Sequence, residues 1–170
     1  MLTLAQKQAL RAAIVAEPAW NGFLTNPDPD IRIANAETIA AEFNATDATF
    51  TVWKTNVSIR EIGDNIVGND LAGLSSLNNT RLQTAVVLAS QGVNPSLADR
   101  RFFFDDIFSG AGGAATRAKL LILWKRLATR AEKLFANTAG GNGANATPAT
   151  LTFEGTITPN DVTDAWEFGA

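Results

Sequence analysis

The chain has 170 residues and a formal net charge of −3, a length that suits one folded core of ordinary domain size. It contains no cysteine, histidine or tyrosine, so it lacks thiolate and imidazole metal ligands, a thiol nucleophile and a side chain that normally titrates near neutral pH. A hydrolytic or redox enzyme would therefore have to work with carboxylates, lysine and serine alone.

The first segment, MLTLAQKQALRAAIVAEP, predicts an amphipathic helix. Thr3 is a suitable N-cap and Pro18 follows the expected end, which gives a helix of about 14 residues. The segment lacks the charged start and apolar core of a signal peptide, and no apolar run in the chain approaches the length of about 20 residues that crosses a bilayer. We therefore expect neither export nor a membrane partner.

The next part of the chain predicts short helices separated by turns and one extended segment. The dipeptides Asn26-Pro27 and Asp28-Pro29 indicate a turn. β-Branched and aromatic residues favour an extended segment near 46–57, with a strand at 50–54. Apolar periodicity places helices at 34–43, 59–62, 71–77 and 80–91. Gly92 is a suitable residue to follow the last of these helices.

The stretch RRFFFDDIFSGAGG, residues 100–113, contains three consecutive phenylalanines within a predicted helix. Ser96 is a suitable cap for a helix over 97–108. Successive residues of a helix differ by about 100° in direction, so three consecutive phenylalanines cannot all face one core. We expect at least two of them to be buried and one to contact another chain, with Phe102 and Phe103 as the candidates for that contact.

The same geometry separates the carboxyl groups of Asp105 and Asp106, so we expect solvation, or ion pairs with Arg100 and Arg101, rather than a metal site. The glycines that follow, within SGAGG, lack the Lys-Ser/Thr ending of a phosphate-binding loop. The sequence predicts a tight corner between two helices there, with no metal and no cofactor.

A long helix is predicted over 113–135, because its apolar residues recur at helical spacing and form one arc. Leu121 and Ile122 lie outside that arc and offer a second apolar contact. Between residues 117 and 133 there are six basic residues and one acidic residue, a local charge of +5 that leaves −8 for the rest of the chain. A narrow stripe on this helix is formed by Lys119, Arg126, Arg130 and Lys133. It is interpreted as a solvated face, as a surface for an acidic region of another copy, or as a nonspecific contact with DNA.

Composition changes after residue 137. Residues 138–150 are rich in Gly, Ala, Asn and Thr and predict a flexible linker between a helical body at 1–137 and a C-terminal strand and tail at 151–170. The alternation in 151–157 predicts a strand that pairs with 50–54. Thr158 or Asn160 would cap a final short helix. Trp166 and Phe168 are candidate anchors for a partner, with folding back on their own domain as the alternative.

These patterns predict a mainly α protein, a helical bundle with one long helix, a small β element and extended termini. The candidate interface residues are Phe102, Phe103, Lys119, Arg126, Arg130, Lys133, Trp166 and Phe168.

The block NPSLADRRFFFDDIFSGAGGAATRAKLLILWKRLATRAEKLFA, with the later ATPATLTFEGTITPNDV, resembles a family of small tailed-bacteriophage virion proteins of the head-to-tail connector (adaptor) type. The resemblance covers residues 50–165, and DIFSG and LTFEG are its distinctive parts. It implies a helical, non-enzymatic subunit of a homo-oligomeric ring of about twelve copies, with extended termini that clasp neighbours.

The implied partners are the portal protein and other neck and tail proteins, with packaged DNA nearby. The implied location is the virion, assembled in the cytoplasm of the bacterial host. The resemblance implies no catalytic residue. A capsid decoration or minor head protein is the alternative within the virion, and an enzyme that uses lysine and aspartate is a third interpretation.

Overall fold

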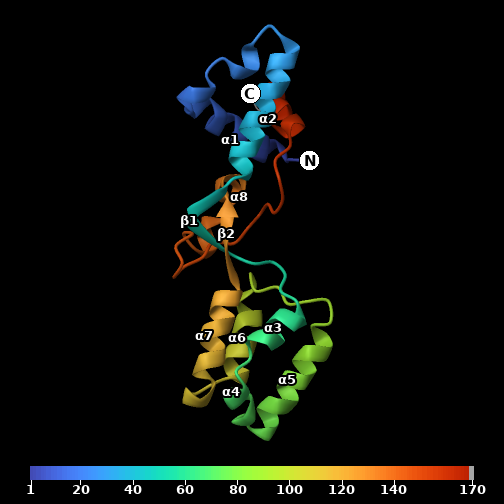
Figure 1. The fold of residues 1–170 in the computed structure, drawn as a ribbon, viewed down its shortest axis with the longest axis vertical. Helices are drawn as coiled ribbons and strands as arrows, with labels where there is room; N and C mark the ends of the chain where they lie inside the picture. The colour runs from blue at the N-terminus through green and yellow to red at the C-terminus, as the bar shows by residue number, and fades with distance from the viewer. Residues whose placement is uncertain (169–170) are drawn as a thin grey trace. The chain divides into compact units, whose positions relative to one another are not determined.

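The computed structural model describes residues 1–168 and is mainly α-helical, with one pair of short strands among those residues (Figure 1). The prediction of a mainly α protein with a small β element is confirmed. Internal contacts divide the chain into unit 1, Met1–Phe50 with Leu127–Ala170, and unit 2, Thr51–Arg126. The boundaries fall within the strands β1 (Thr46–Trp53) and β2 (Lys125–Thr129).

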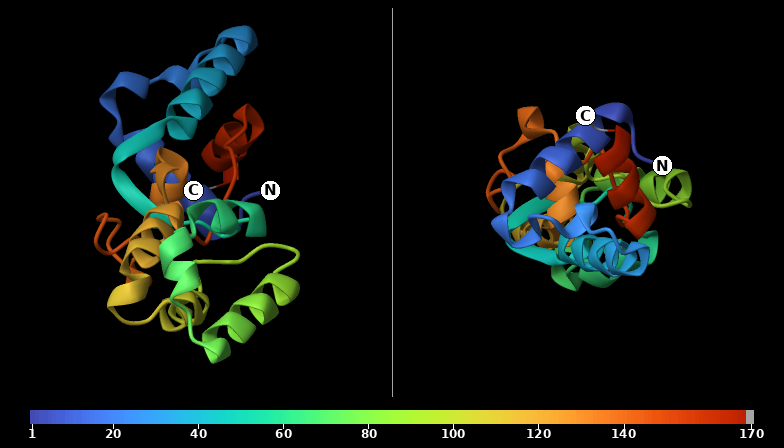
Figure 2. Two further views of the ribbon diagram at one scale, coloured as in Figure 1. Left: turned by 60° about the horizontal axis from the view of Figure 1, so that its bottom comes forward. Right: turned by 90° about the horizontal axis from the view of Figure 1, so that it is seen from above.

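Unit 1 is built from helices of both ends of the chain. They are α1 (Leu4–Ala16), η1 (Pro18–Trp20), η2 (Phe23–Thr25), α2 (Pro29–Asn44), α8 (Arg130–Phe135), η4 (Thr138–Gly140) and α9 (Pro159–Phe168). Helix α9 packs against α1 and α2, as Figure 2 also shows. Leu10, Ile14, Ile39 and Val162 lie in the resulting core.

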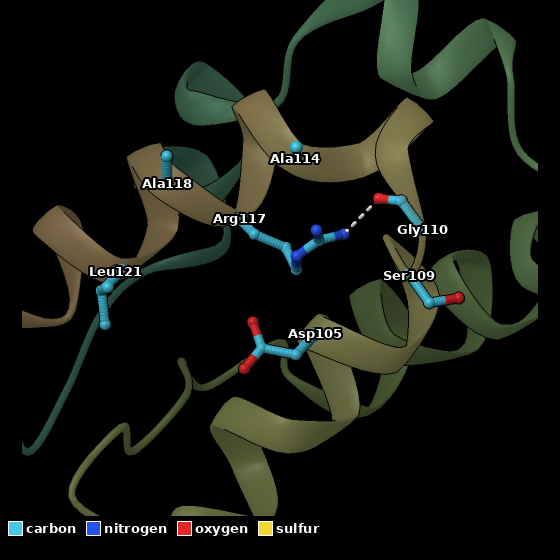
Figure 3. Close-up of a pocket in the computed structure, with 7 residues that line it drawn as sticks. All are labelled: Asp105, Ser109, Gly110, Ala114, Arg117, Ala118 and Leu121. Carbon is cyan, nitrogen blue, oxygen red and sulfur yellow. Dashed lines mark hydrogen bonds between the residues drawn. The ribbon is translucent and has the colours of Figure 1, made fainter.

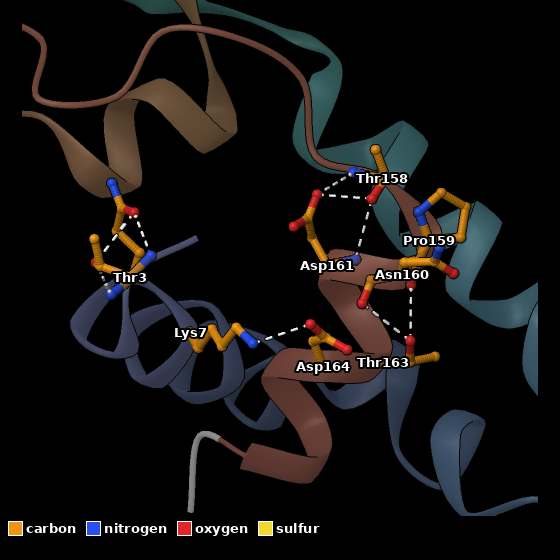
Figure 4. A network of polar contacts seen from close by, with 9 residues as sticks. Thr3, Lys7, Thr158, Pro159, Asn160, Asp161, Thr163 and Asp164 are labelled. Carbon is orange, nitrogen blue, oxygen red and sulfur yellow. Dashed lines mark hydrogen bonds and ion pairs between the residues drawn. The ribbon is translucent and has the colours of Figure 1, made fainter. Parts of the chain in front are cut away.

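Local capping explains where these helices begin. Thr3 caps α1 as predicted and forms a capping box with Gln6. Thr158 and Asp161 exchange the equivalent hydrogen bonds before α9 (Figure 4). Helix α2 begins at Pro29 rather than at residue 34, because Asp28 accepts a hydrogen bond from the Asp30 amide and proline suits the first helical position.

Unit 2 is a second helical cluster. Its helices are α3 (Ile59–Asn65), α4 (Gly68–Ala72), α5 (Ser76–Leu88), α6 (Ala98–Ile107), η3 (Ala111–Gly113) and α7 (Ala114–Leu123). Its core includes Phe104, Phe108, Leu120 and Trp124. Ser96 is not the cap of α6 as predicted: Leu97 takes that position, and the Ser96 hydroxyl donates to Asn94 at 2.6 Å.

The prediction of one long helix over 113–135 is wrong. Helix α7 ends at Leu123, residues 125–129 form β2, and α8 begins at Arg130. The Lys54 amide donates to the Trp124 carbonyl at 2.8 Å, and the Arg130 amide to that of Ala45 at 3.0 Å. Pairing with β1 therefore replaces helical hydrogen bonds in this segment, and a capping box between Thr129 and Glu132 starts the next helix.

The predicted pairing of 50–54 with 151–157 is also wrong, because β1 pairs with β2. Residues 151–157 pack onto unit 1 without forming a strand. Phe153 makes an edge contact with Phe135. The Asn44 side chain accepts a hydrogen bond from the backbone amide of the buried Ile157 at 2.7 Å and donates one to the Ile157 carbonyl at 2.8 Å.

The segment 138–150 is a packed loop of unit 1 rather than an extended linker. Isolated bridges join Asn137 to Thr150 and Ala144 to Thr147. Gly143 adopts a φ of +82° and lies so close to the Phe50 ring that a Cβ atom would collide with it. The structure therefore divides the chain differently from the predicted body, linker and arm. The segments Leu4–Ala16 and Pro159–Phe168 are helices, whereas the termini were predicted to be extended.

None of the helices in residues 1–168 combines the length and the apolar character that a membrane span requires.

Candidate interaction surface

Helix α6 carries the three consecutive phenylalanines, and they have different environments. Phe104 is buried against Trp124, with ring centroids 5.6 Å apart. Phe102 is 64% exposed and Phe103 is 38% exposed. The expectation that at least two would be buried is wrong, because α6 turns only the side of Phe104 and Ile107 toward the core of unit 2.

The glycine-rich stretch after α6 is the predicted tight corner. Gly110 has a φ of +79°, and Gly113 lies against the Phe108 backbone with no room for a Cβ atom. The Arg117 guanidinium spans the corner: its Nη1 donates to the carbonyl of Phe108 and, at 2.9 Å, to that of Gly110 (Figure 3). These contacts tie the start of α7 to the residues that follow α6.

An open groove of about 560 Å³ is lined by residues of α6, the corner and α7 (Figure 3). We call it the α6–α7 groove. Its lining is formed by Asp105, Ser109, Gly110, Ala114, Arg117, Ala118 and Leu121. Partial burial raises the pKa of the Asp105 carboxyl above its ordinary value, and the Arg117 and Arg101 guanidinium groups oppose that rise.

The charged residues beside the phenylalanines contact other parts of unit 2. Asp106 pairs with Arg81 of α5 at 2.6 Å, instead of the predicted Arg100 or Arg101. The Arg101 guanidinium lies 3.9 Å from the centroid of the Trp53 ring and donates to the Pro95 carbonyl, and burial lowers its pKa. No group of three or more side chains suited to metal binding occurs within residues 1–168.

The predicted basic stripe is not one face of a single helix, because its residues lie on three elements. Lys119 is exposed on α7, and Arg126 is half-buried in β2. In α8, Arg130 pairs with Glu42 and Lys133 pairs with Asp47 at 2.8 Å. Both of these ion pairs lie inside unit 1, so Arg130 and Lys133 are already matched by acidic groups of their own chain.

The two aromatic residues of α9 lie next to basic residues of α1. Trp166 is half-buried, with the Arg11 guanidinium 5.4 Å from its ring. Phe168 is 61% exposed, although Lys7 lies 5.5 Å from its ring and pairs with Asp164 at 2.9 Å (Figure 4). Trp166 therefore contacts its own unit, and Phe168 retains accessible surface.

Unit 2 exposes many large apolar side chains. They are Leu71, Leu77, Val86, Val87, Leu88, Leu97, Phe102, Phe103, Leu121 and Ile122. The exposure of Leu121 and Ile122 agrees with their predicted position outside the apolar arc. The run Val86–Leu88 was missed, although three consecutive apolar residues in a helix cannot all face one core.

The two units differ in charge. Unit 1 contains five basic and eleven acidic residues, a formal charge of −6, whereas unit 2 contains nine basic and six acidic residues, a formal charge of +3. Unit 2 thus combines a positive charge with exposed aromatic and aliphatic residues and with the α6–α7 groove. Such a surface is typical of a site where another macromolecule binds.

Comparison of the chain with models of protein families, with curated proteins and with solved structures gave no match.

Proposed function

We propose that the chain is a non-enzymatic structural subunit of a tailed-phage virion. In this proposal its copies assemble into a connector ring between head and tail, attached to the portal protein. The observation that carries the proposal is the opposite charge of the two units, −6 and +3. Unit 1 of one copy attracts unit 2 of the next, so the chain is suited to associate with itself.

An attraction between unlike surfaces produces a particular kind of assembly. Each copy uses unit 2 for one neighbour and leaves unit 1 for another, which is a heterologous contact. Repetition of such a contact gives a closed ring when the rotation between neighbours closes. Connector rings require this arrangement, and a symmetric dimer does not provide it.

The exposed aromatic residues support the same proposal. A small number of buried aromatic side chains often supplies most of the binding free energy of an interface. Phe102 and Phe103 on α6 and Phe168 on α9 all retain accessible surface. The positive charge of unit 2 also favours nonspecific contact with packaged DNA.

The place in the virion rests on the resemblance of residues 50–165 to connector proteins, and a count of copies in purified particles tests it. Quantitative mass spectrometry of the virion is expected to find about a dozen copies, the number of subunits in one ring. Hundreds of copies would instead support the capsid-decoration alternative. Absence of the chain from purified particles would contradict both virion roles.

A further inference from the structure

We propose that the α6–α7 groove of one copy binds the outer face of helix α2 of a second copy. This inference rests on the proposed function, because it assumes that the chain assembles with itself, and it specifies the two surfaces that meet. The outer face of α2 consists of exposed residues at helical spacing: Asp30, Ile33, Ala34, Glu37 and Ala41.

The side of the groove formed by α7 carries small side chains. Ala114 and Ala118 are exposed and short, so the backbone of an incoming helix can approach α7 closely. Leu121 lines the groove about one turn beyond Arg117, away from the corner, and Phe102 precedes Asp105 by about one turn on α6. Their exposed side chains would pack against Ile33, which is itself 55% exposed.

The charges on α2 are opposite to the net charge of the unit that carries the groove. Asp30 and Glu37 lie on either side of Ile33 along the helix, and within residues 1–168 neither carboxylate has a basic partner. Asp105 is the acidic residue of the groove, and Arg117 and Arg101 offset its charge. The incoming carboxylates therefore meet a surface that belongs to the positive unit of the neighbouring copy.

The alternative of two grooves that face each other is disfavoured by the same charges. That symmetric contact would place unit 2 of one copy, with a net charge of +3, against unit 2 of another copy, which has the same charge. Contact between the groove and α2 instead joins unlike charges and leaves a free groove and a free α2 at the ends, as ring growth requires.

Two charge changes test the contact. Ala118→Glu places a carboxylate in the groove, and Glu37→Lys reverses the charge on α2. Each variant alone is expected to raise the Kd for self-association at least about tenfold, measured by sedimentation velocity of the full chain. The controls are Ala115→Glu, which alters an exposed alanine of α7 outside the groove lining, and Glu167→Lys, which makes the same charge change on α9.

Mixing the two variants makes the test specific. In an equimolar mixture the altered groove faces the altered α2, and the unaltered groove faces the unaltered α2, so association is expected to return toward that of the wild type. Recovery in the mixture, with both controls unaffected, supports the inference. An oligomer that neither variant weakens would overturn it while leaving the connector role intact. Wild-type protein that stays monomeric at all concentrations would overturn both.

Discussion

Phe102 and Phe104 are two residues apart in the chain and have opposite roles in the structure. Phe104 is 3% exposed and Phe102 is 64% exposed. Replacement of Phe104 with alanine is expected to lower the free energy of unfolding by about 3–5 kcal/mol, because it leaves a cavity beside Trp124. Phe102→Ala should change it by less than about 0.5 kcal/mol. Urea denaturation of both variants measures the difference, and equal losses would contradict the assignment of Phe102 to the surface.

Asp47 gives the fold a pH dependence. Hydrogen bonds from Lys133 and Thr49 hold the pKa of its carboxyl well below its ordinary value of 3.8. Because this pKa is lower in the folded chain than in the unfolded chain, the carboxylate stabilises the fold above about pH 4, and its contribution is lost as the pH falls through the native pKa.

Asp47→Asn is therefore expected to lower the free energy of unfolding at pH 7, by up to about 1 kcal/mol for an ion pair that water partly screens. The difference between variant and wild type should shrink progressively below about pH 4. Denaturation curves at several pH values provide the measurement. A difference that grows in acid would show that the sign of the pKa shift is wrong.

The loop 138–150 makes a close approach to the Phe50 ring of unit 1. Gly143 and Gly110 both have positive φ angles, of +82° and +79°. A Cβ atom at Gly143 would collide with the Phe50 ring, whereas a Cβ atom at Gly110 would meet open space. Alanine at either position strains the backbone, whereas alanine at 143 must also displace Phe50. We expect Gly143→Ala to lower the melting temperature more than Gly110→Ala does. Equal losses would mean that the loop does not pack on Phe50.

Helix α9 belongs to the core of unit 1, which predicts the outcome of a truncation. Removal of residues 158–170 exposes Leu10, Ile14 and Ile39, which lie in the same core cluster as the buried Val162 and Ala165. The truncated chain is expected to lose helical circular dichroism at a lower temperature than the full chain. An unchanged melting curve would show instead that the C-terminal segment is a dispensable arm.

Local signals predicted several elements correctly, and contacts between distant residues explain the errors. Thr3 was recognised as a cap, and Thr158 was one of two candidates with Asn160, because the partners of both threonines are three residues away. The break after Leu123 was missed because the apolar period continues through it, although the spacing of Thr129 and Glu132 is the local signature of a new helix. Pairing of β2 with β1 overrides the helical preference of 125–129, and periodicity cannot reveal such a partner.

The candidate surface was only partly predictable for the same reason. The exposure of Leu121 and Ile122 follows from helical angles alone. The groove depends on how the corner orients α6 and α7, which Arg117 and Gly113 determine through contacts with the Phe108 backbone. The ion pairs of Arg130 and Lys133 join residues 88 and 86 positions apart, so no local pattern indicates that these basic groups are matched.

Across the molecule, charge is distributed by folded unit rather than by one helix. The sequence showed an excess of basic residues at 117–133, but the structure assigns Arg130 and Lys133 to the acidic unit 1 and the other basic residues of that segment to unit 2. The net result is a chain with one negative and one positive unit. Attraction between the unlike units of different copies is the central claim of the proposed function.

Sedimentation velocity of the purified full chain over a range of salt concentrations tests this claim most directly. The Debye length falls from about 10 Å at 0.1 M salt to about 3 Å at 1 M, so added salt weakens attraction between exposed charges. We predict complexes of several copies at low salt that dissociate toward monomers as salt is raised. A chain that is monomeric at every salt concentration, or complexes that strengthen with added salt, would contradict the claim.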